Sequence, residues 1–381
     1  MKKISHIFIL AGEPSGERYG AALAKNLAKA VPEIRLSGLG GERMHEAGVS
    51  LIAHIRSLSF MGFTGIIKHL PLIYAIRQSV LKNIMKTKPD AIVLIDFPDF
   101  NLGIAKAVHR WKRHYCPSLK FFYFIPPQVW IWRQSRIHTI KKYCDAVFPI
   151  FQFEHELYRK FEIPSYFFGH PISDFLPQQY DQKRAEKQEN RTVVSLFPGS
   201  RKQEIIKILP VMLKSVRKFN TTHPLSVRIN VAEDIDGQLV EKIIRGYELE
   251  ITLSRNTHQL IAEADLVLSK SGTINLEIAY FAKPAIIIYK TSWLNYWIAK
   301  WFIRPKFISL INILSGSEVV REFIQGNATT DNIVMEMSRI LSDANYRANM
   351  ISRIGALKKT IFDQRQPVLQ NIAATIIHHM Q

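Results

Sequence analysis

Short apolar runs alternate with amphipathic stretches along the first half of the chain. Apolar runs at residues 6–11, 34–39 and 91–95 are typical of buried strands, and residues 17–30 and 70–85 between them have helical spacing. Further strands are expected at residues 120–125, 146–150 and 166–168. Strands that alternate with helices predict a parallel, doubly wound sheet, so the expected fold class is α/β.

A second alternating series follows a polar interruption. Residues 173–191 are rich in charged and amide side chains, which predicts a linker with an exposed helical piece. Beyond it, strands are expected at residues 192–197, 226–231, 250–253, 266–269 and 285–289. The chain has a helical pattern from Thr330 onward, and this part is expected to pack back on the first half. We therefore predict α/β domains at residues 1–172 and 192–340, with returning helices at residues 341–381.

Composition agrees with two domains in a reducing compartment. A chain of 381 residues is long enough for two or three domains with real cores. Cys116 and Cys144 are too few for a disulfide framework or a zinc site, so the cytoplasm is expected. The first apolar run soon meets Glu13, unlike a signal peptide, and no uninterrupted apolar run reaches the roughly 18 residues that span a bilayer.

The excess of basic residues calls for an anionic partner. Lys and Arg outnumber Asp and Glu by 51 to 32, for a net charge of +19. Tryptophans and cations interleave at residues 293–306, as in a helix that lies on an anionic membrane surface, and residues 121–124 and 129–133 form a second aromatic stretch. Both stretches could equally be ordinary core. Nucleic acid is not expected, because no helix-turn-helix, RNA-recognition or zinc signature accompanies the charge.

Two carboxylates stand where the strand at residues 91–95 ends. Ligands of open α/β sheets bind beyond the carboxyl ends of strands, which makes Asp96 or Asp99 a candidate general base. Pro98 cannot continue a central strand and leaves Asp96 at its tip. The structural alternative is that one of them caps the following helix, for which Asp99 is the better placed.

Three strand-to-helix turns carry small residues. In the second half, Gly199, Ser200 and Arg201 would offer backbone N–H groups and a permanent charge to a diphosphate. Further on, Ser271, Gly272 and Thr273 could do the same, with Glu277 one helical turn on reaching a ribose diol. Near the N-terminus, Glu13 and Ser15 could grip an acceptor. An ordinary turn, or tight packing of helix on strand, is the alternative in each case. A P-loop is excluded by the missing Gly-x-x-x-x-Gly-Lys-Ser/Thr pattern.

Together these residues resemble the lipid-A-disaccharide synthase family, whose patterns recur in order along nearly the whole chain. The matching positions are Ala11-Gly12-Glu13 with Ser15-Gly16, Gly41 with Met44, Met61-Gly62, Ile95-Asp96 with Pro98-Asp99-Phe100-Asn101, Pro127-Gln128-Val129-Trp130 with Trp132-Arg133, Phe153-Glu154, Gly169-His170, Pro198-Gly199-Ser200-Arg201 with Glu204, Ser271-Gly272-Thr273 with Leu276-Glu277, and Ser309-Leu310 with Asn312.

The resemblance implies a GT-B fold, in which two Rossmann-like domains face each other across a cleft, the first for the acceptor and the second for a UDP-sugar. Asp96 matches the family's proposed catalytic base. The implied acceptor-binding residues are Glu13, Ser15, Gly16, Asn101 and Gln128. The implied donor-binding residues are Gly199, Ser200, Arg201, Glu204, Ser271, Gly272, Thr273, Glu277 and Asn312. No metal and no cofactor are expected, because backbone donors and Arg201 can neutralise the leaving diphosphate and no Asp-x-Asp pair is obvious.

The implied reaction moves 2,3-diacylglucosamine from its UDP derivative to 2,3-diacylglucosamine 1-phosphate, inverts the anomeric centre, and yields a β-1,6-linked disaccharide and UDP. Such an enzyme is expected on the cytoplasmic face of the inner membrane of a Gram-negative cell, with a homodimer left open. A UDP-sugar 2-epimerase, another GT-B enzyme and a diverged or non-catalytic paralogue are the alternatives.

The chain departs from the family's usual pattern at four positions. Glu17 stands in place of aspartate, Gly65 in place of glutamate and Gln152 in place of proline, all in the half that would bind the acceptor. Lys270 stands in place of a small residue, beside the presumed diphosphate.

Overall fold

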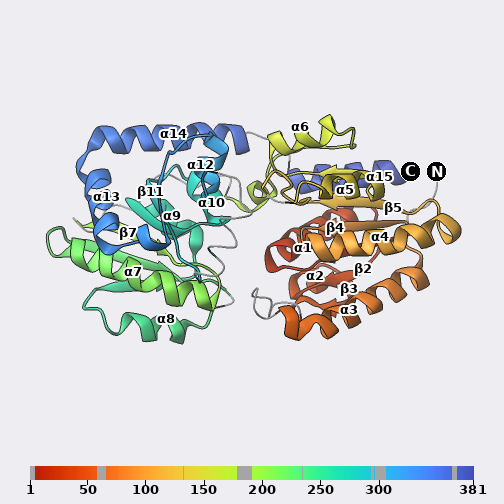
Figure 1. Ribbon diagram of the computed structural model, residues 1–381, viewed down its shortest axis with the longest axis horizontal. Helices are drawn as coiled ribbons and strands as arrows, with labels where there is room; N and C mark the ends of the chain where they lie inside the picture. The colour runs from red at the N-terminus through yellow and green to blue at the C-terminus, as the bar shows by residue number, and fades with distance from the viewer. Residues whose placement is uncertain are drawn as a thin grey trace. The chain divides into compact units, whose positions relative to one another are not determined.

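Two six-stranded parallel sheets organise the chain (Figure 1). The computed structural model describes residues 5–57, 66–131, 133–177, 191–233, 235–292, 296, 306–362 and 367–381. They form two compact units. The first comprises the chain up to Phe175 together with its last helix, and the second runs from Leu176 through the helix before that one.

The sheet of the first unit is doubly wound, with strand order β3-β2-β1-β4-β5-β6. Its centre, where the order reverses, is formed by β1 and β4, whose residues are all buried. This explains why both strands read as continuous apolar runs. The strands are β1 His6–Ala11, β2 Arg35–Gly40, β3 Val49–His54, β4 Ala91–Ile95, β5 Lys120–Phe124 and β6 Ala146–Phe148.

Helices cover both faces of this sheet. Helix α1 packs against α2 and α15 on one face, and α3, α4 and α5 follow one another on the other. The helices are α1 Pro14–Ala30, α2 Glu42–Glu46, α3 Ile66–Thr87, α4 Pro98–Tyr115, α5 Arg136–Tyr143, α6 Gln152–Lys160 and α15 Val368–Met380, with 3-10 turns η1 Ile55–Ser57 and η2 Pro171–Phe175.

The sheet of the second unit repeats this plan, with order β12-β11-β10-β7-β8-β9 and its reversal between β7 and β10. The strands are β7 Thr192–Phe197, β8 Leu225–Asn230, β9 Ile251–Ser254, β10 Leu266–Lys270, β11 Ala285–Tyr289 and β12 Arg321–Ile324. The helices are α7 Lys202–Asn220, α8 Gly237–Ile244, α9 Thr257–Glu263, α10 Ile274–Tyr280, α12 Leu310–Ser315, α13 Thr330–Ser342 and α14 Ala344–Phe362, with η3 Gln325–Asn327.

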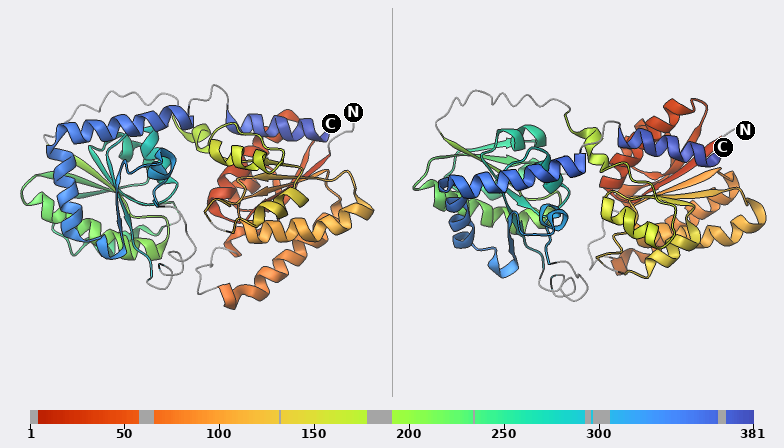
Figure 2. Two further views of the ribbon diagram at one scale, coloured as in Figure 1. Left: turned by 45° about the horizontal axis from the view of Figure 1, so that its top comes forward. Right: turned by 90° about the horizontal axis from the view of Figure 1, so that it is seen from above.

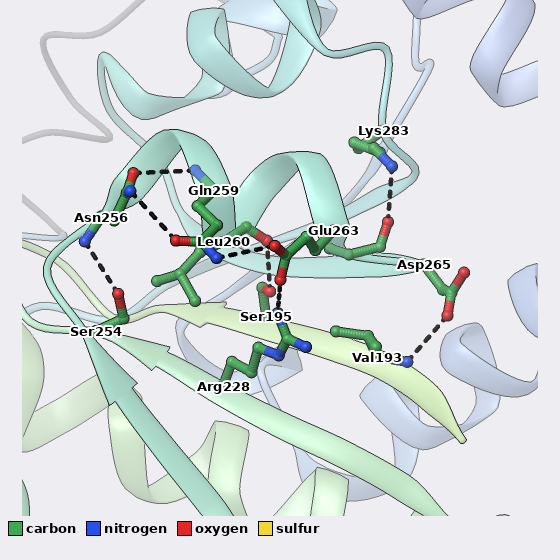
Figure 3. A network of polar contacts seen from close by, with 11 residues as sticks. Val193, Ser195, Arg228, Ser254, Asn256, Gln259, Leu260, Glu263, Asp265 and Lys283 are labelled. Atoms are coloured by element: carbon green, nitrogen blue, oxygen red, sulfur yellow. Dashed lines mark hydrogen bonds and ion pairs between the residues drawn. The ribbon is translucent and has the colours of Figure 1, made fainter. Parts of the chain in front are cut away.

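A polar network anchors the short helix α9 to this second sheet (Figure 3). The side chain of Asn256 caps the helix by accepting a hydrogen bond from the Gln259 N–H at 3.2 Å. At the other end Glu263 forms an ion pair with Arg228 of β8. The buried hydroxyl of Ser195 on β7 donates to the Leu260 carbonyl at 2.7 Å. A seven-residue helix is marginal alone, so these contacts fix its position.

The last two helices belong to different units. Helix α14 packs on α10, α12 and α13 of the second unit, where Tyr346 donates a hydrogen bond to Glu336 at 2.8 Å. Helix α15, blue in Figures 1 and 2, packs on α1 of the first unit. The carboxylate of Asp174 accepts from the N–H groups of Val368 and Leu369 at 2.9 and 2.8 Å. The prediction that residues 341–381 return as a whole is therefore corrected: only α15 does.

The strand assignment also differs from the prediction. Strands β3 and β12 were not expected, and residues 166–168 form no strand, since the segment makes only an isolated bridge from Ser165 to Val147.

Residues 121–124, for which an acyl or membrane surface and ordinary core were both open, are core residues that are fully buried on β5. Most of residues 293–306 and of the expected linker lie outside the described residues. No helix in the described ranges is both long enough and apolar enough to cross a membrane.

Candidate active site

Asp96 lies at the tip of β4 on a sharply bent backbone. Asp96 and Phe97 both have φ of 47°, a left-handed conformation that costs free energy in residues other than glycine. Pro98 then opens α4 as its first residue. This bend follows the last residue of β4, Ile95, and leaves Asp96 at the carboxyl end of the strand, the position that the sequence predicts.

Two buried side chains hold the backbone of Asp96. The amide of Asn101 donates to the carbonyl of Asp96 at 2.7 Å and to that of Ile95 at 3.2 Å. The hydroxyl of Tyr123 donates to the same Asp96 carbonyl at 2.9 Å. Asn101 has no exposed surface, and its amide holds the main chain of Asp96 in position. A contact between Asn101 and the acceptor stays a prediction.

The environment of Asp96 suits a base. Burial and, to a smaller extent, the nearby Glu13 carboxylate together raise the pKa of this carboxyl to about 6, although the Phe97 N–H partly opposes both. A general base works best with a pKa close to the working pH. The raised pKa therefore distinguishes Asp96 from an ordinary surface aspartate.

This pKa predicts the direction of the pH dependence. Only the carboxylate accepts a proton, so kcat/KM should be high above about pH 6 and fall as the pH drops through that value. Glu13→Gln removes a like charge and should move this acid limb to lower pH. The free energy of unfolding depends on pH in the opposite direction. The folded state binds this proton more tightly than the unfolded state does, so the contribution of Asp96 to stability declines as the pH rises. A pH–rate profile of both proteins checks the shift, and an unmoved limb would contradict it.

Asp99 does not cap α4. Its side chain is 69% exposed and accepts hydrogen bonds from Arg133 at 2.9 Å and Arg136 at 2.5 Å. No side chain forms the cap hydrogen bond of this helix. Asp99 thus ties α4 to the start of α5, and the predicted cap is wrong.

The turn after β1 lies beside the turn at Asp96, because Ala11 pairs with Ile95 across the two central strands. A Cβ on Gly12 would come within 2.2 Å of the Phe97 ring, and one on Gly16 would touch Ile95 at 3.5 Å. Glu13 is partly buried next to Asp96, and Ser15 is exposed at the start of α1. The structure therefore brings Glu13, Ser15 and Gly16 to the edge that carries the base.

Gln128 lies on the loop that leaves β5, the strand next to β4. It is exposed, and no hydrogen bond ties it to Asp96 among the described residues. A role for Gln128 in binding the acceptor stays a prediction.

Two of the unusual residues in this half have structural roles. Glu17 is buried, and its carboxylate accepts a hydrogen bond from the Met44 N–H in the first turn of α2 at 3.1 Å. Gln152 opens α6 and donates to Glu156 at 3.3 Å. Gly65 lies outside the described residues.

A buried carboxylate holds a tryptophan at the same end of this sheet. Trp130 donates its indole N–H to Glu154 at 2.9 Å, and the ring of Phe153 stands edge-on to Trp130 at 5.0 Å. Burial raises the pKa of Glu154 to about 7. Trp130 and Glu154 both stand in patterns that match the family, but the sequence gives them no role. Their contact joins positions 24 residues apart, so only the fold reveals it.

In the second unit, the turn from β7 into α7 is closely packed around Gly199. Gly199 has φ of 122°, and a Cβ there would come within 2.5 Å of a Glu204 carboxylate oxygen. Ser200 is exposed. The side chain of Arg201 is 75% exposed, and its guanidinium lies 3.8 Å from the Glu204 carboxylate. The N–H groups of the 19-residue α7 begin here, so the turn can receive a phosphate group as predicted.

Lys270 joins this turn to the one after β10. Its ammonium lies 3.1 Å from Glu204, and a Cβ on Gly272 would lie 3.5 Å from the same nitrogen. The other Glu204 oxygen is buried without a hydrogen bond partner in the described part of the chain. Both charges are mostly buried, with 19% and 16% of their side chains exposed, so the pair is held firmly.

This bridge predicts a measurable effect on nucleotide binding. Lys270→Ala removes an ammonium between the two turns and leaves Glu204 with only the largely exposed Arg201, 3.8 Å away, so UDP affinity should fall about tenfold. Lys270→Arg keeps the charge and should retain most of the affinity. Titration calorimetry with UDP measures both, and an unchanged affinity in Lys270→Ala would sink the prediction.

The turn after β10 uses part of its polar groups internally. The Ser271 hydroxyl donates to the Ile308 carbonyl at 2.7 Å, and the Gly272 N–H donates to Asn275 at 3.3 Å. The Ser271 hydroxyl hydrogen and the Gly272 N–H are therefore already used within the protein, unlike the expectation that both donate to phosphate. Thr273, the residue before α10, remains a candidate.

Glu277 is buried within α10 and meets a partner that sequence reasoning missed. His258 Nε2 lies 3.1 Å from one of its carboxylate oxygens. His258 belongs to α9, the helix that the network of Figure 3 anchors. A contact between Glu277 and a ribose diol stays a prediction.

Asn312 has a structural role in the second unit. Its amide donates to the Val320 carbonyl at 2.8 Å and to Glu322 at 2.7 Å, and its oxygen accepts from the N–H groups of Val319 and Val320 at 2.7 and 3.0 Å. The side chain is fully buried, and its two hydrogens and two lone pairs are all used. Asn312 thus fastens α12 to the segment that leads into β12, and its contact with the donor stays a prediction.

Two units, each built on a doubly wound six-stranded parallel sheet, define the GT-B class of fold. Solved structures agree on this fold alone. The glycotransferase of kitacinnamycin superposes with a TM-score of 0.64 at 11% identity over 100% of both chains. The UDP-GlcNAc 2-epimerase from Neisseria meningitidis bound to UDP-GlcNAc gives 0.57 at 12% identity over 99% of both chains.

Within this class, the chain belongs to the lipid-A-disaccharide synthetase family, whose profile matches residues 7–375. The lipid-A-disaccharide synthase of Coxiella burnetii (strain CbuG_Q212) is 35% identical over 383 residues, 98% of this chain and of that protein. The lipid-A-disaccharide synthase 1 of Legionella pneumophila (strain Paris) is 32% identical over 95% of this chain and 94% of that protein. The predicted family is thus confirmed, and the 2-epimerases are only distant relatives in structure.

Proposed function

We propose that this chain is an inverting glycosyltransferase of lipid A biosynthesis. It moves 2,3-diacylglucosamine from UDP-2,3-diacylglucosamine to 2,3-diacylglucosamine 1-phosphate and releases UDP. Membership of the family over nearly the whole chain supports the substrates. The observation that carries the mechanism is Asp96, a carboxylate with a raised pKa on a backbone that Asn101 and Tyr123 hold in place.

In the proposed reaction Asp96 accepts the proton of the acceptor 6-hydroxyl. The oxygen forms a bond to the anomeric carbon of the donor while the bond from that carbon to the diphosphate oxygen breaks, so one displacement inverts the centre. The charge that develops on UDP is met by Arg201 and by the free N–H groups at the start of α7. Glu277 holds the ribose, and Glu13, Ser15 and Gln128 hold the acceptor. This route uses no cofactor.

A substrate panel tests the proposal against its alternatives. The protein is incubated with UDP-2,3-diacylglucosamine and the acceptor 1-phosphate, and separately with UDP-GlcNAc alone. We expect UDP and disaccharide from the first mixture and no epimer from the second. An epimerised UDP-sugar would favour the epimerase, and nucleotide binding without turnover would favour a non-catalytic paralogue.

We also propose that the protein works at an anionic membrane surface on the cytoplasmic side, since both substrates carry acyl chains and the net charge is +19. Three large apolar side chains near the start of α3 are exposed, which supports such contact: Leu70, Leu72 and Tyr74. Flotation with vesicles that contain phosphatidylglycerol should recover the protein at low salt and less at high salt. No recovery at low salt would reject this part of the proposal.

A further inference from the structure

A cavity of about 530 Å³ lies in the second unit, apart from the two turns proposed for the nucleotide. Helix α7, the residues after β11 and the segment from η3 into α13 line it. Its size falls in the range of small-molecule sites. None of the donor-site residues named above lines it, so it needs an occupant of its own.

Three lysines from two elements surround this cavity. Lys207 and Lys214 are two turns apart on α7 and share a face, and Lys290 follows β11. No carboxylate lines the cavity within the described residues. The closest acids along the chain are engaged elsewhere, since Glu204 pairs with Lys270 and Asp331 pairs with Lys218 at 2.6 Å. Like charges that line one cavity repel one another, and a bound anion would offset that repulsion.

The walls of the cavity are fixed by hydrogen bonds. Gln325, buried with φ of 51°, accepts from the Thr291 N–H at 2.8 Å and donates to its carbonyl at 3.3 Å. Lys290 donates to the Ala328 carbonyl at 3.1 Å, which leaves two of its ammonium hydrogens for a ligand. A site whose walls are already ordered loses less entropy when a ligand binds.

The remaining lining is apolar or hydroxylic. Pro210, inside α7, has no N–H to pair with the Ile206 carbonyl, and its ring faces the cavity beside Val211. Thr329 and Thr330 add hydroxyls where α13 begins. Cations and hydroxyls suit a phosphate group, and the apolar wall suits the carbon skeleton attached to it.

We propose that this lysine cavity, defined by Lys207, Lys214 and Lys290, binds a phosphate group carried on a small organic molecule or on a phospholipid. It is a second phosphate site, distinct from the nucleotide turns and separate from the proposed transfer reaction. The two sources share one chemistry and are told apart by the arms of the test.

The test uses the full chain with saturating UDP, so that the nucleotide turns are occupied. Inorganic phosphate and glycerol 3-phosphate are titrated by calorimetry, and vesicles of phosphatidylglycerol or of phosphatidylcholine are tested by flotation. The native protein should bind at least one phosphate probe, and the double substitution Lys207→Ala with Lys214→Ala should weaken that binding about tenfold or more. Lys218→Ala is the matched control, because Lys218 lies on α7 but pairs with Asp331 outside the cavity.

The outcomes distinguish a soluble phosphate compound from a phospholipid, and failure of this inference from failure of the proposed function. Binding of glycerol 3-phosphate points to a soluble ligand, and lysine-dependent flotation on phosphatidylglycerol alone points to a lipid. The inference is overturned if no probe binds the native protein, or if the double variant binds as well as Lys218→Ala does. UDP affinity, measured first, reports on the proposed function alone and should be unchanged in the double variant.

Discussion

Asp96→Asn is expected to lower kcat for disaccharide formation about a thousandfold, in the range that a general base contributes. Asparagine has the shape of aspartate but cannot accept the proton of the acceptor hydroxyl. The contacts that hold this residue go to its backbone carbonyl, from Asn101 and Tyr123, so the substitution should leave the turn intact. UDP affinity should stay within about twofold, because the nucleotide turns belong to the other unit.

Asp99→Asn is the matched control for this prediction. Asp99 lies three residues further along, is largely exposed, and pairs with Arg133 and Arg136. Its substitution should change kcat by less than about threefold, since exposed ion pairs contribute little. The assignment of the base fails if Asp96→Asn keeps more than about a tenth of native kcat while Asp99→Asn is the damaged variant.

Asn312→Ala is expected to destabilise the second unit by about 3–5 kcal/mol, more than most single substitutions do. The change leaves the Val320 carbonyl and the N–H groups of Val319 and Val320 buried without their partner, and removes a donor from Glu322. Urea unfolding followed by a probe in the second unit measures the loss.

The same variant distinguishes a structural role from a donor contact. Asn332→Ala is a suitable control, because Asn332 is only partly buried and its side-chain amide donates one hydrogen bond, to the Asn327 carbonyl at 2.9 Å. If Asn312→Ala unfolds like the native chain but binds UDP poorly, Asn312 would touch the donor after all. The account predicts the reverse, a lower unfolding midpoint with UDP affinity retained at low temperature.

The central strands could be predicted from the sequence, and two edge strands could not. Buried strands such as β4 and β11 are continuous apolar runs, since both their faces are covered. At the edges, β3 is only partly buried and β12 has four residues, so neither gives a clear apolar run. Residues 166–168 have the composition of a strand, but the segment makes only an isolated bridge to β6, at Ser165, next to the hydrogen bond from the Tyr166 N–H to the Val147 carbonyl.

The site could be predicted where chemistry follows from position along the chain. Asp96 and the small-residue turns stand at the ends of strands, and the order of strands in a parallel sheet brings such ends to one edge. The structural roles of Asn101 and Asn312 were missed because an amide that binds a ligand and an amide that hydrogen-bonds buried backbone look alike in sequence. The pairs His258 with Glu277 and Lys270 with Glu204 join distant positions, so only the fold reveals them.

The anomeric configuration of the product tests the central claim most directly. A single displacement assisted by Asp96 must invert the donor carbon, so nuclear magnetic resonance of the disaccharide should show a β linkage from an α-linked donor. One UDP should appear for each disaccharide formed. A product that retains the donor configuration would require a covalent intermediate and would contradict the mechanism proposed for Asp96.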